Sequence, residues 1–372
     1  MFRKLIFRDS RGARCLRLGV ALLAFTTGVA PLALADWVKT YAWSAQVGLG
    51  GIVPSPSDPH RVYAFRGDAP WFLSSNDGGA TWQRTPDLAR YSYVANLAVD
   101  PFDAGTIYVI VSSSIAPGLY KSTDAGTTLE RVAKDVFVND GSAVTIDPSN
   151  RNILYAPRPV VCSQSCSQGG IVKSVDGGLT WSDTARDDSA NGPIAIDPND
   201  PLILYTAGFD LPESRKTGGL YRTTDGGLTW PSMFPGSTYI RFLTTDKRSR
   251  VYAIVDVMFE TPLLRSTNHG DLWTRLSIKV PPPPPGFVEG IWPQLTAFAY
   301  DPRRSETLYV SSYTHGVLAS YDDGGTWQPL GELPDPFVNR LAVTAEGIVL
   351  AATRSGIYRW VPPPTRGRAA RR

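Results

Sequence analysis

The stretch GGIVKSVDGGLTWSD, residues 169 to 183, contains a motif that returns throughout the chain. The motif follows the pattern S-x-D-x-G-x-T-W, and we call it the box. Its copies follow one another at intervals of roughly fifty residues, which is typical of proteins built from structural repeats. The boxes are SNDGGATW around Asp77, STDAGTTL around Asp124, SVDGGLTW around Asp176, TTDGGLTW around Asp225, STNHGDLW around Asn268 and SYDDGGTW around Asp322.

A second element precedes each box. Short segments rich in Val, Ile, Leu and Tyr flank a turn, as in LAVDPFDAGTIYVI at 97–110, where Asp-Pro suits the first two positions of a type I turn. A seventh copy, LAVTAEGIVLAAT at 341–353, lacks Asp-Pro and is followed by GIYRW instead of a box. Seven units therefore carry six boxes, and their short apolar runs predict antiparallel strands.

These units predict an all-β fold, a seven-bladed β-propeller of four-stranded antiparallel blades. An open solenoid is the alternative, but it needs distinct polar caps at its two ends. Here the ends resemble two halves of one unit, because the last unit stops after its third strand and ADWVKT at 35–40 resembles the fourth strand ATWQRT at 80–85. We therefore predict that the N-terminal strand around Trp37 closes the last blade.

The residue types of the box suit a tight hairpin between the third and fourth strands. Its glycine can adopt positive φ, and its acid can accept hydrogen bonds from backbone amides of the turn. Its tryptophan can bury an indole between neighbouring blades. Equivalent acids at separate turns cannot converge on one substrate atom, so we predict structural roles for them. The residues concerned are Asp77, Asp124, Asp176, Asp225, Asn268 and Asp322, with Trp82, Trp181, Trp230, Trp273 and Trp327.

The N-terminal segment has the features of a secretory signal peptide. Basic residues precede an apolar run from Leu18 to Leu34, and the run ends in the small-x-small pattern Ala-Leu-Ala. The run is short for a membrane span, so we expect cleavage after Ala35, export to the periplasm or the medium, and no membrane span in the mature protein. The predicted organisation is a signal peptide at 1–35, a single propeller at 36–361 and a disordered Arg-containing tail at 362–372.

Composition limits the partners and the chemistry. Without the signal and the tail, the chain holds 27 basic and 33 acidic residues, which gives no electrostatic footprint for nucleic acid. We expect a monomer without an organic cofactor or a bound metal. Cys162 and Cys166 predict a local disulfide in an exported protein, and metal binding is the weaker alternative because no histidine is adjacent to them in sequence.

With these boxes the chain resembles the BNR or Asp-box propeller superfamily over nearly all of 36–361. That superfamily includes bacterial sialidases, xyloglucanase-type glycosidases, sortilin-like receptor domains and a photosystem assembly factor. The resemblance therefore implies the fold and leaves the function open between enzymes and binding proteins. It also implies that the boxes lie on the face opposite the ligand site. The ligand face would then consist of the loops that join the second strand to the third and each blade to the next.

These loops carry the candidate ligand-contacting residues. An aromatic side chain on a loop can serve as a stacking platform for a sugar or as an anchor for a peptide. The candidates are Arg66, Trp71, Arg158, Arg241, Trp292, Tyr313, Arg340 and Arg354, and the same loops carry Tyr239, Asp256 and Glu260.

Two functions remain open at this point. We favour a binding module for a protein or glycan partner. The alternative is a glycoside hydrolase that uses two loop carboxylates, with Asp140 named first and Asp68 or Glu289 as its partner. The sialidase form of that alternative is disfavoured, because the Arg-Ile-Pro signature of sialidases does not occur. Xyloglucanase-type enzymes commonly use two propellers with the cleft between them, and this chain has enough residues for one.

Overall fold

The computed structural model describes residues 36–43, 49–88, 92–133, 144–158, 170–184, 192–208, 219–235, 239–257, 260–279, 294–312 and 315–362. These residues fall in one compact unit, Ala35–Pro362. They form strands and no helix, and the strands make seven four-stranded antiparallel sheets. The predicted all-β architecture is therefore confirmed.

Each sheet is one blade. The strands are listed here in the order in which they pair. Blade one contains β2 (Leu49–Pro54), β3 (Val62–Arg66), β4 (Phe72–Ser75) and β5 (Gln83–Arg84). Blade two contains β6 (Ser92–Val99), β7 (Ile107–Ser113), β8 (Gly118–Ser122) and β9 (Glu130–Ala133). Blade three contains β10 (Thr145–Asp147), β11 (Asn150–Arg158), β12 (Gly170–Ser174) and β13 (Ser182–Asp183). Blade four contains β14 (Ile194–Ile196), β15 (Leu204–Gly208), β16 (Gly219–Thr223) and β17 (Ser232–Pro235).

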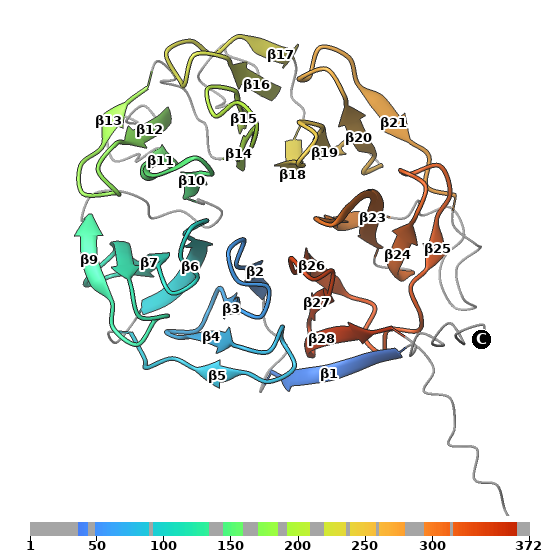
Figure 1. The fold of residues 1–372 in the computed structure, drawn as a ribbon, viewed down its shortest axis with the longest axis horizontal. Helices are drawn as coiled ribbons and strands as arrows, with labels where there is room; N and C mark the ends of the chain where they lie inside the picture. The colour runs from blue at the N-terminus through green and yellow to red at the C-terminus, as the bar shows by residue number, and fades with distance from the viewer. Residues whose placement is uncertain are drawn as a thin grey trace, which may run out of the picture. The chain divides into compact units, whose positions relative to one another are not determined.

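Blade five contains β18 (Tyr239–Thr245), β19 (Val251–Asp256), β20 (Leu263–Ser266) and β21 (Thr274–Leu276). Blade six contains β22 (Leu295–Asp301), β23 (Arg304–Ser312), β24 (Gly316–Ser320) and β25 (Gln328–Pro329). Blade seven contains β26 (Val338–Val343), β27 (Val349–Thr353), β28 (Gly356–Val361) and, at its outer edge, β1 (Asp36–Ala42). Figure 1 shows the blades around a ring, with the first strand of each consecutive run innermost.

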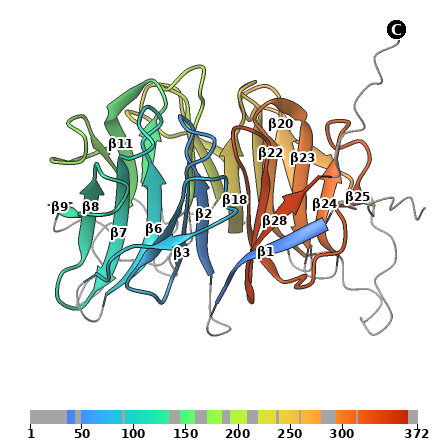
Figure 2. The same cartoon turned by 60° about the horizontal axis from the view of Figure 1, so that its bottom comes forward.

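The N-terminal strand closes the ring, as predicted. β1 pairs antiparallel with β28, and Trp37 lies opposite Trp360. Figure 2 shows β1 lying along the outside of β28. The Trp37 side chain is only 4% exposed, and its Nε1 donates a hydrogen bond to the carbonyl of Leu330 in blade six at 2.6 Å. One residue therefore joins the first strand to the two last blades.

The hydrophobic core is divided into seven clusters, each shared by two adjacent blades. Every box tryptophan packs against the cluster between its own blade and the preceding blade, as predicted. Trp37 takes this place in blade seven, and Leu129 takes it in blade two. The five box tryptophans are Trp82, Trp181, Trp230, Trp273 and Trp327.

Buried tyrosines of the second strands also join the blades, a role that the sequence did not predict. The hydroxyl of Tyr108 donates to the carbonyl of Gly177 in the next blade at 3.0 Å, and that of Tyr155 donates to Gly226 at 3.2 Å. Tyr63 makes a similar bond to Ala104 at 2.7 Å. Burial raises the pKa of Tyr63 to about 12, so its phenol remains a neutral donor at physiological pH.

The boxes form the predicted hairpins. The hydroxyl of Ser174 donates to Asp176 Oδ1 at 2.8 Å and accepts from the amide of Gly178 at 2.8 Å. Thr180 donates its hydroxyl to Asp176 Oδ2 at 2.5 Å and its amide to Oδ1 at 2.9 Å. These bonds from Thr180 lower the pKa of Asp176 to about 2. Because its oxygens are engaged within its own turn, the acid has the structural role that we predicted.

Trp37→Ala should lower the free energy of unfolding by about 3–5 kcal/mol, because it leaves a cavity between blades six and seven. Removal of residues 36–43 should lower the thermal midpoint sharply. Denaturant unfolding of Trp37→Ala and thermal unfolding of the truncated chain measure these effects. Val38→Ala is the matched control, since Val38 is on the same strand and is 48% exposed. An unchanged midpoint after the truncation would contradict closure by β1.

Asp176→Ala should destabilise the protein more than Asp176→Asn. The asparagine keeps one acceptor oxygen, as the natural Asn268 does for the amide of Leu272 at 2.9 Å. The folded-state pKa of Asp176 lies below its ordinary value, so its carboxylate stabilises the fold above pH 4 or so and loses this effect as the pH falls toward about 2. Urea unfolding at pH 7 and pH 3 should therefore show a smaller loss for Asp176→Asn than for the wild type. Equal losses would contradict the assigned role.

Candidate functional site

The two ends of the blades carry different connections. In an antiparallel blade, the hairpins between strands one and two and between strands three and four lie at one end, which we call the box face. The connections from strand two to three and from one blade to the next lie at the other end, which we call the loop face. In blade three the two hairpins of the box face touch, because the amide of Gly177 donates to the carbonyl of Asn152 at 2.9 Å. The boxes are therefore separated from the candidate ligand-contacting loops, as predicted.

The loop face of blade one holds a fixed ion pair. Arg66 is the last residue of β3 and is only 6% exposed. Its Nε donates to Asp68 Oδ1 at 2.8 Å, and its Nη2 donates to Oδ2 at 2.7 Å. This two-bond geometry fixes the orientation of the carboxylate. The side chain of Asp68 is 39% exposed, so a buried cation presents a carboxylate to solvent.

The connection that carries Asp68 is attached to the end of β3, to the segment that follows β5 and to the next blade. The amide of Ala69 donates to the carbonyl of Arg66 at 3.4 Å, while the carbonyl of Ala69 accepts from the amide of Val94 in blade two at 3.0 Å. The carbonyl of Pro70 accepts from the amide of Leu88 at 2.6 Å. A functional group on such a supported backbone keeps its position, which catalysis and specific binding require.

Two tryptophans accompany this pair. The Arg66 guanidinium carbon lies 5.6 Å from the centre of the Trp43 ring, and Trp43 Nε1 donates to the carbonyl of Thr353 in blade seven at 3.2 Å. Trp71 ends the same connection as Asp68, and the guanidinium carbon of Arg84 lies 4.7 Å from the centre of its ring. Trp71 is half-buried beneath Arg84, and its role as a stacking platform stays a prediction. Trp43 was not among the predicted residues.

Blade five has a second charged cluster on the loop face. Arg241 donates to both carboxylate oxygens of Asp256, at 3.1 and 2.8 Å. Tyr239 lies opposite Asp256 in the pairing of β18 with β19 and is 47% exposed. Glu260 forms an ion pair with Arg275 at 2.7 Å. The structure thus brings together Tyr239, Arg241, Asp256 and Glu260, which the sequence placed only in a list of loop residues.

A β-bulge places Arg241 in this cluster. The register of β18 against β19 shifts between Ile240 and Phe242, so Arg241 is the extra residue. Four other innermost strands, β2, β6, β22 and β26, have a shift near their loop-face ends as well. A bulge bends a strand and re-aims a side chain. The repeated bulges therefore bend the innermost strands near the loop face. In blade five the bulged residue is Arg241, so the bulge sets the direction of its guanidinium group.

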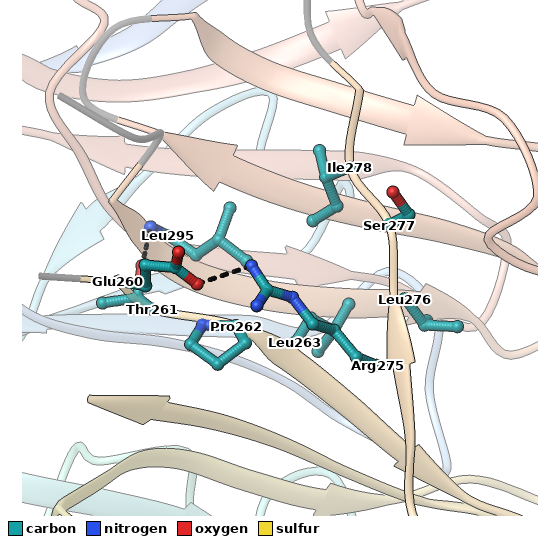
Figure 3. Close-up of a pocket in the computed structure, with 9 residues that line it drawn as sticks. All are labelled: Glu260, Thr261, Pro262, Leu263, Arg275, Leu276, Ser277, Ile278 and Leu295. Carbon is teal, nitrogen blue, oxygen red and sulfur yellow. Dashed lines mark hydrogen bonds and ion pairs between the residues drawn. The ribbon is translucent and has the colours of Figure 1, made fainter. Parts of the chain in front are cut away.

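A small pocket lies beside the ion pair of blade five. Figure 3 shows Glu260 and Arg275 facing each other across it, with Pro262, Ile278 and Leu295 around them. The amide of Leu295 donates to the Thr261 hydroxyl at 2.6 Å, which ties blade six to this edge. The pocket has a volume of about 80 Å³, whereas pockets for small-molecule ligands usually have about 300 Å³ or more. It has room for water and is too small for a sugar ring.

Blade seven places two more predicted arginines on the loop face. The Arg354 guanidinium carbon lies 4.3 Å from the centre of the Phe337 ring. Asp335 accepts from the amide of Ser355 at 2.8 Å, which fixes the turn next to Arg354. Arg340 is exposed and donates to the carbonyl of Asn339 at 2.9 Å.

Several predicted residues lie outside the described residues: Asp140, Glu289, Trp292, Tyr313, Cys162 and Cys166. Arg158 ends β11, but its side chain is not described. The disulfide and the acids Asp140 and Glu289 therefore remain predictions. Within the described ranges, no group of three or more His, Cys, Asp or Glu side chains could hold a metal ion. The same ranges contain no helix that is long and apolar enough to cross a membrane.

Comparison with known proteins found sequence relatives that are named xyloglucanases. No family model matches the chain. A xyloglucanase of Hypocrea jecorina is 26% identical over 144 residues, which cover 39% of this chain and 16% of that protein. A xyloglucanase of a Paenibacillus species is 28% identical over 180 residues, 40% of this chain and 17% of that protein. A probable oligoxyloglucan-reducing end-specific xyloglucanase of Neosartorya fischeri is 29% identical over 181 residues, 46% of this chain and 21% of that protein.

This chain is similar to xyloglucanases. Among solved structures, the GH74 xyloglucanase of Xanthomonas campestris superposes with a TM-score of 0.65 at 18% identity, covering 87% of this chain and 53% of that one. A GH74 enzyme of Niastella koreensis superposes with a TM-score of 0.62 at 18% identity, covering 86% and 53%. YCF48 bound to a D1 peptide gives a TM-score of 0.62 at 14% identity, covering 88% and 96%. The structures support the propeller fold, and this chain spans about half the length of the two GH74 enzymes.

Proposed function

We propose that this chain is a glycoside hydrolase that acts on a xyloglucan-type polysaccharide across its loop face. The support from sequence is its similarity to three xyloglucanases, at 26 to 29% identity. The matched residues span only part of those proteins, so xyloglucanase activity is proposed for this chain on the basis of similarity. The observation that carries the proposal is the exposed carboxylate of Asp68, which the buried Arg66 holds in a fixed orientation on the loop face. The sequence matches favour this function over the binding module that we favoured from the sequence alone.

The proposed reaction adds water across a glycosidic bond. One carboxylic acid protonates the leaving oxygen, while a second carboxylate takes a proton from water or attacks the anomeric carbon. Asp68 suits the second role. Both of its oxygens accept N–H bonds from Arg66, and these two bonds hold the carboxylate in one orientation. Each oxygen has a further lone pair that can accept a hydrogen bond from water.

The proton donor must come from another acid on the loop face. Blades one and five stand on opposite sides of the ring in Figure 1, whereas the two carboxylates of a glycosidase are about 5 to 10 Å apart. We therefore assign Asp256 and Glu260 to substrate binding and retain Asp140, in the connection between β9 and β10, as the proposed proton donor. Tyr239 would contribute an aromatic surface beside these acids, which suits a sugar ring.

The predicted location is compatible with this substrate. A polysaccharide of this class is encountered outside the cytoplasm, and the predicted signal peptide at 1–35 would deliver the chain there. Export of the chain is part of the proposal.

Asp68→Asn should lower kcat on xyloglucan by about 100-fold or more, because the amide cannot act as a base or a nucleophile. Asp140→Asn should give a loss of similar size. Release of reducing ends by residues 36–372 measures both. Glu306→Gln on the box face is the matched control, and it should have wild-type activity and stability because the exposed pair of Glu306 with Arg248 contributes little.

Two outcomes would reject this assignment. Wild-type protein that binds xyloglucan without releasing reducing ends would support the binding-module alternative. Full activity of Asp68→Asn would remove Asp68 from the mechanism and leave hydrolysis to other loop acids.

A further inference from the structure

The second box departs from the others at its last position. Residue 129 is leucine, whereas the other five boxes end in tryptophan and blade seven receives Trp37 from the N-terminal strand. Leu129 packs against the core between blades one and two, at the place where an indole packs at the other six junctions of the described ring. This junction is therefore built with a smaller side chain than its equivalents.

A neighbouring phenylalanine replaces part of the missing volume. The residue of blade one that faces the second box is Phe72, and its ring is so close that a Cβ on Gly126 would meet its Cζ at 2.4 Å. At the next junction the equivalent residue is Leu119, and a Cβ on Gly178 would meet it at 3.5 Å. The larger ring of Phe72 therefore reaches toward the turn where the indole is missing.

Phe72 does not fill all of the space that an indole would occupy at this junction. A cavity of about 270 Å³ lies at this junction, between Pro86 and Leu88 of blade one and Val111, Tyr120 and Leu129 of blade two. A second cavity of about 220 Å³ shares Pro86, Gly126 and Thr127 with it. An apolar cavity of about 150 Å³ is large enough to hold benzene, so the first cavity has room for one or two fused rings.

Two polar groups at this cavity could bond to a ligand. Ser92 lines the cavity and is 7% exposed, and its Oγ has no hydrogen bond in the described structure. The second group is the carbonyl of Gly126. The equivalent carbonyls of Gly178 and Gly270 accept the indole Nε1 of their own box tryptophan, at 3.0 and 2.8 Å. Leu129 has no donor to offer to Gly126. A buried hydroxyl without a partner, like that of Ser92, is unusual in folded proteins.

We propose that the junction between blades one and two binds a small planar aromatic molecule with an N–H or O–H donor on its ring edge. The ring occupies the place of the missing indole and packs against Leu88, Val111 and Leu129. Its donor bonds to the carbonyl of Gly126, and a polar substituent reaches Ser92. Asp68 does not line this cavity, and the inference does not depend on glycoside hydrolysis.

Free indole is the probe for this site. Ligand-observed NMR titration of residues 36–372 should show saturable binding of one indole, and Leu129→Trp should weaken it about ten-fold or more because the new side chain fills the cavity. Leu129→Phe is a second filling variant in case the tryptophan variant does not fold, and circular dichroism checks the fold of both. 1-Methylindole has no N–H donor, so it should bind several-fold more weakly than indole.

A gain-of-site variant gives the matched control. Trp181→Leu reproduces the Leu129 situation at the junction between blades two and three, so it should add a second indole site. The proposal would be overturned if the wild type did not bind indole. It would also be overturned if Leu129→Trp and Leu129→Phe both bound indole as tightly as the wild type. Binding of N-acetyltryptophanamide without binding of free indole would also overturn it, since it would indicate a tryptophan of a protein partner.

Discussion

The pairing of β1 with β28 is the constraint on which the rest of this structure depends. Each hydrophobic cluster is shared by two blades, so a blade covers its two faces only when it has a neighbour on each side. An open row would leave two terminal faces exposed to water, whereas a closed ring leaves none. Closure requires the start of the chain to reach its end, which has a large loop-closure entropy. The buried ring of Trp37 and its bond to Leu330 offset this cost, because they contribute to the core between blades six and seven.

Internal hydrogen bonds engage many polar groups of the box face. The boxes bond to themselves, the hydroxyls of Tyr63, Tyr108 and Tyr155 bond to the next blade, and several acids of the first hairpins are buried. Asp246 is fully buried and pairs with Arg250 at 2.6 Å, and Arg250 continues to Asp323 of blade six at 2.5 Å. With its polar groups engaged in this way, the box face has few groups left for a ligand. The loop face can vary without disturbing these bonds, which is where proteins commonly place function.

The sequence was sufficient for the fold because the fold repeats. Blade number, strand order and closure follow from the spacing of the boxes and from ADWVKT resembling a fourth strand. The site was predictable only in part. Arg66 and Asp68 were both named, but their pairing depends on a strand that ends at Arg66 and on a turn fixed by blade two. Arg241 and Asp256 are 15 residues apart, and the pairing of β18 with β19, with its bulge at Arg241, brings them together. Sequence periodicity describes the average blade, so it does not predict a bulge or a contact between one particular pair of blades.

Departures from the repeat are therefore the most informative positions of this chain. Asn268 keeps the acceptor oxygen of the box, and it occurs where leucine replaces the threonine that would bond to a second oxygen. Leu129 replaces an indole, and it occurs where the preceding blade supplies Phe72 instead of a smaller residue. In both cases two positions differ together. Asn268 and Leu272 lie in one box, whereas Leu129 lies in a box and Phe72 in the preceding blade. The blades adjust to each other locally, since each interblade core is packed by two units and a change of volume in one is felt by the other.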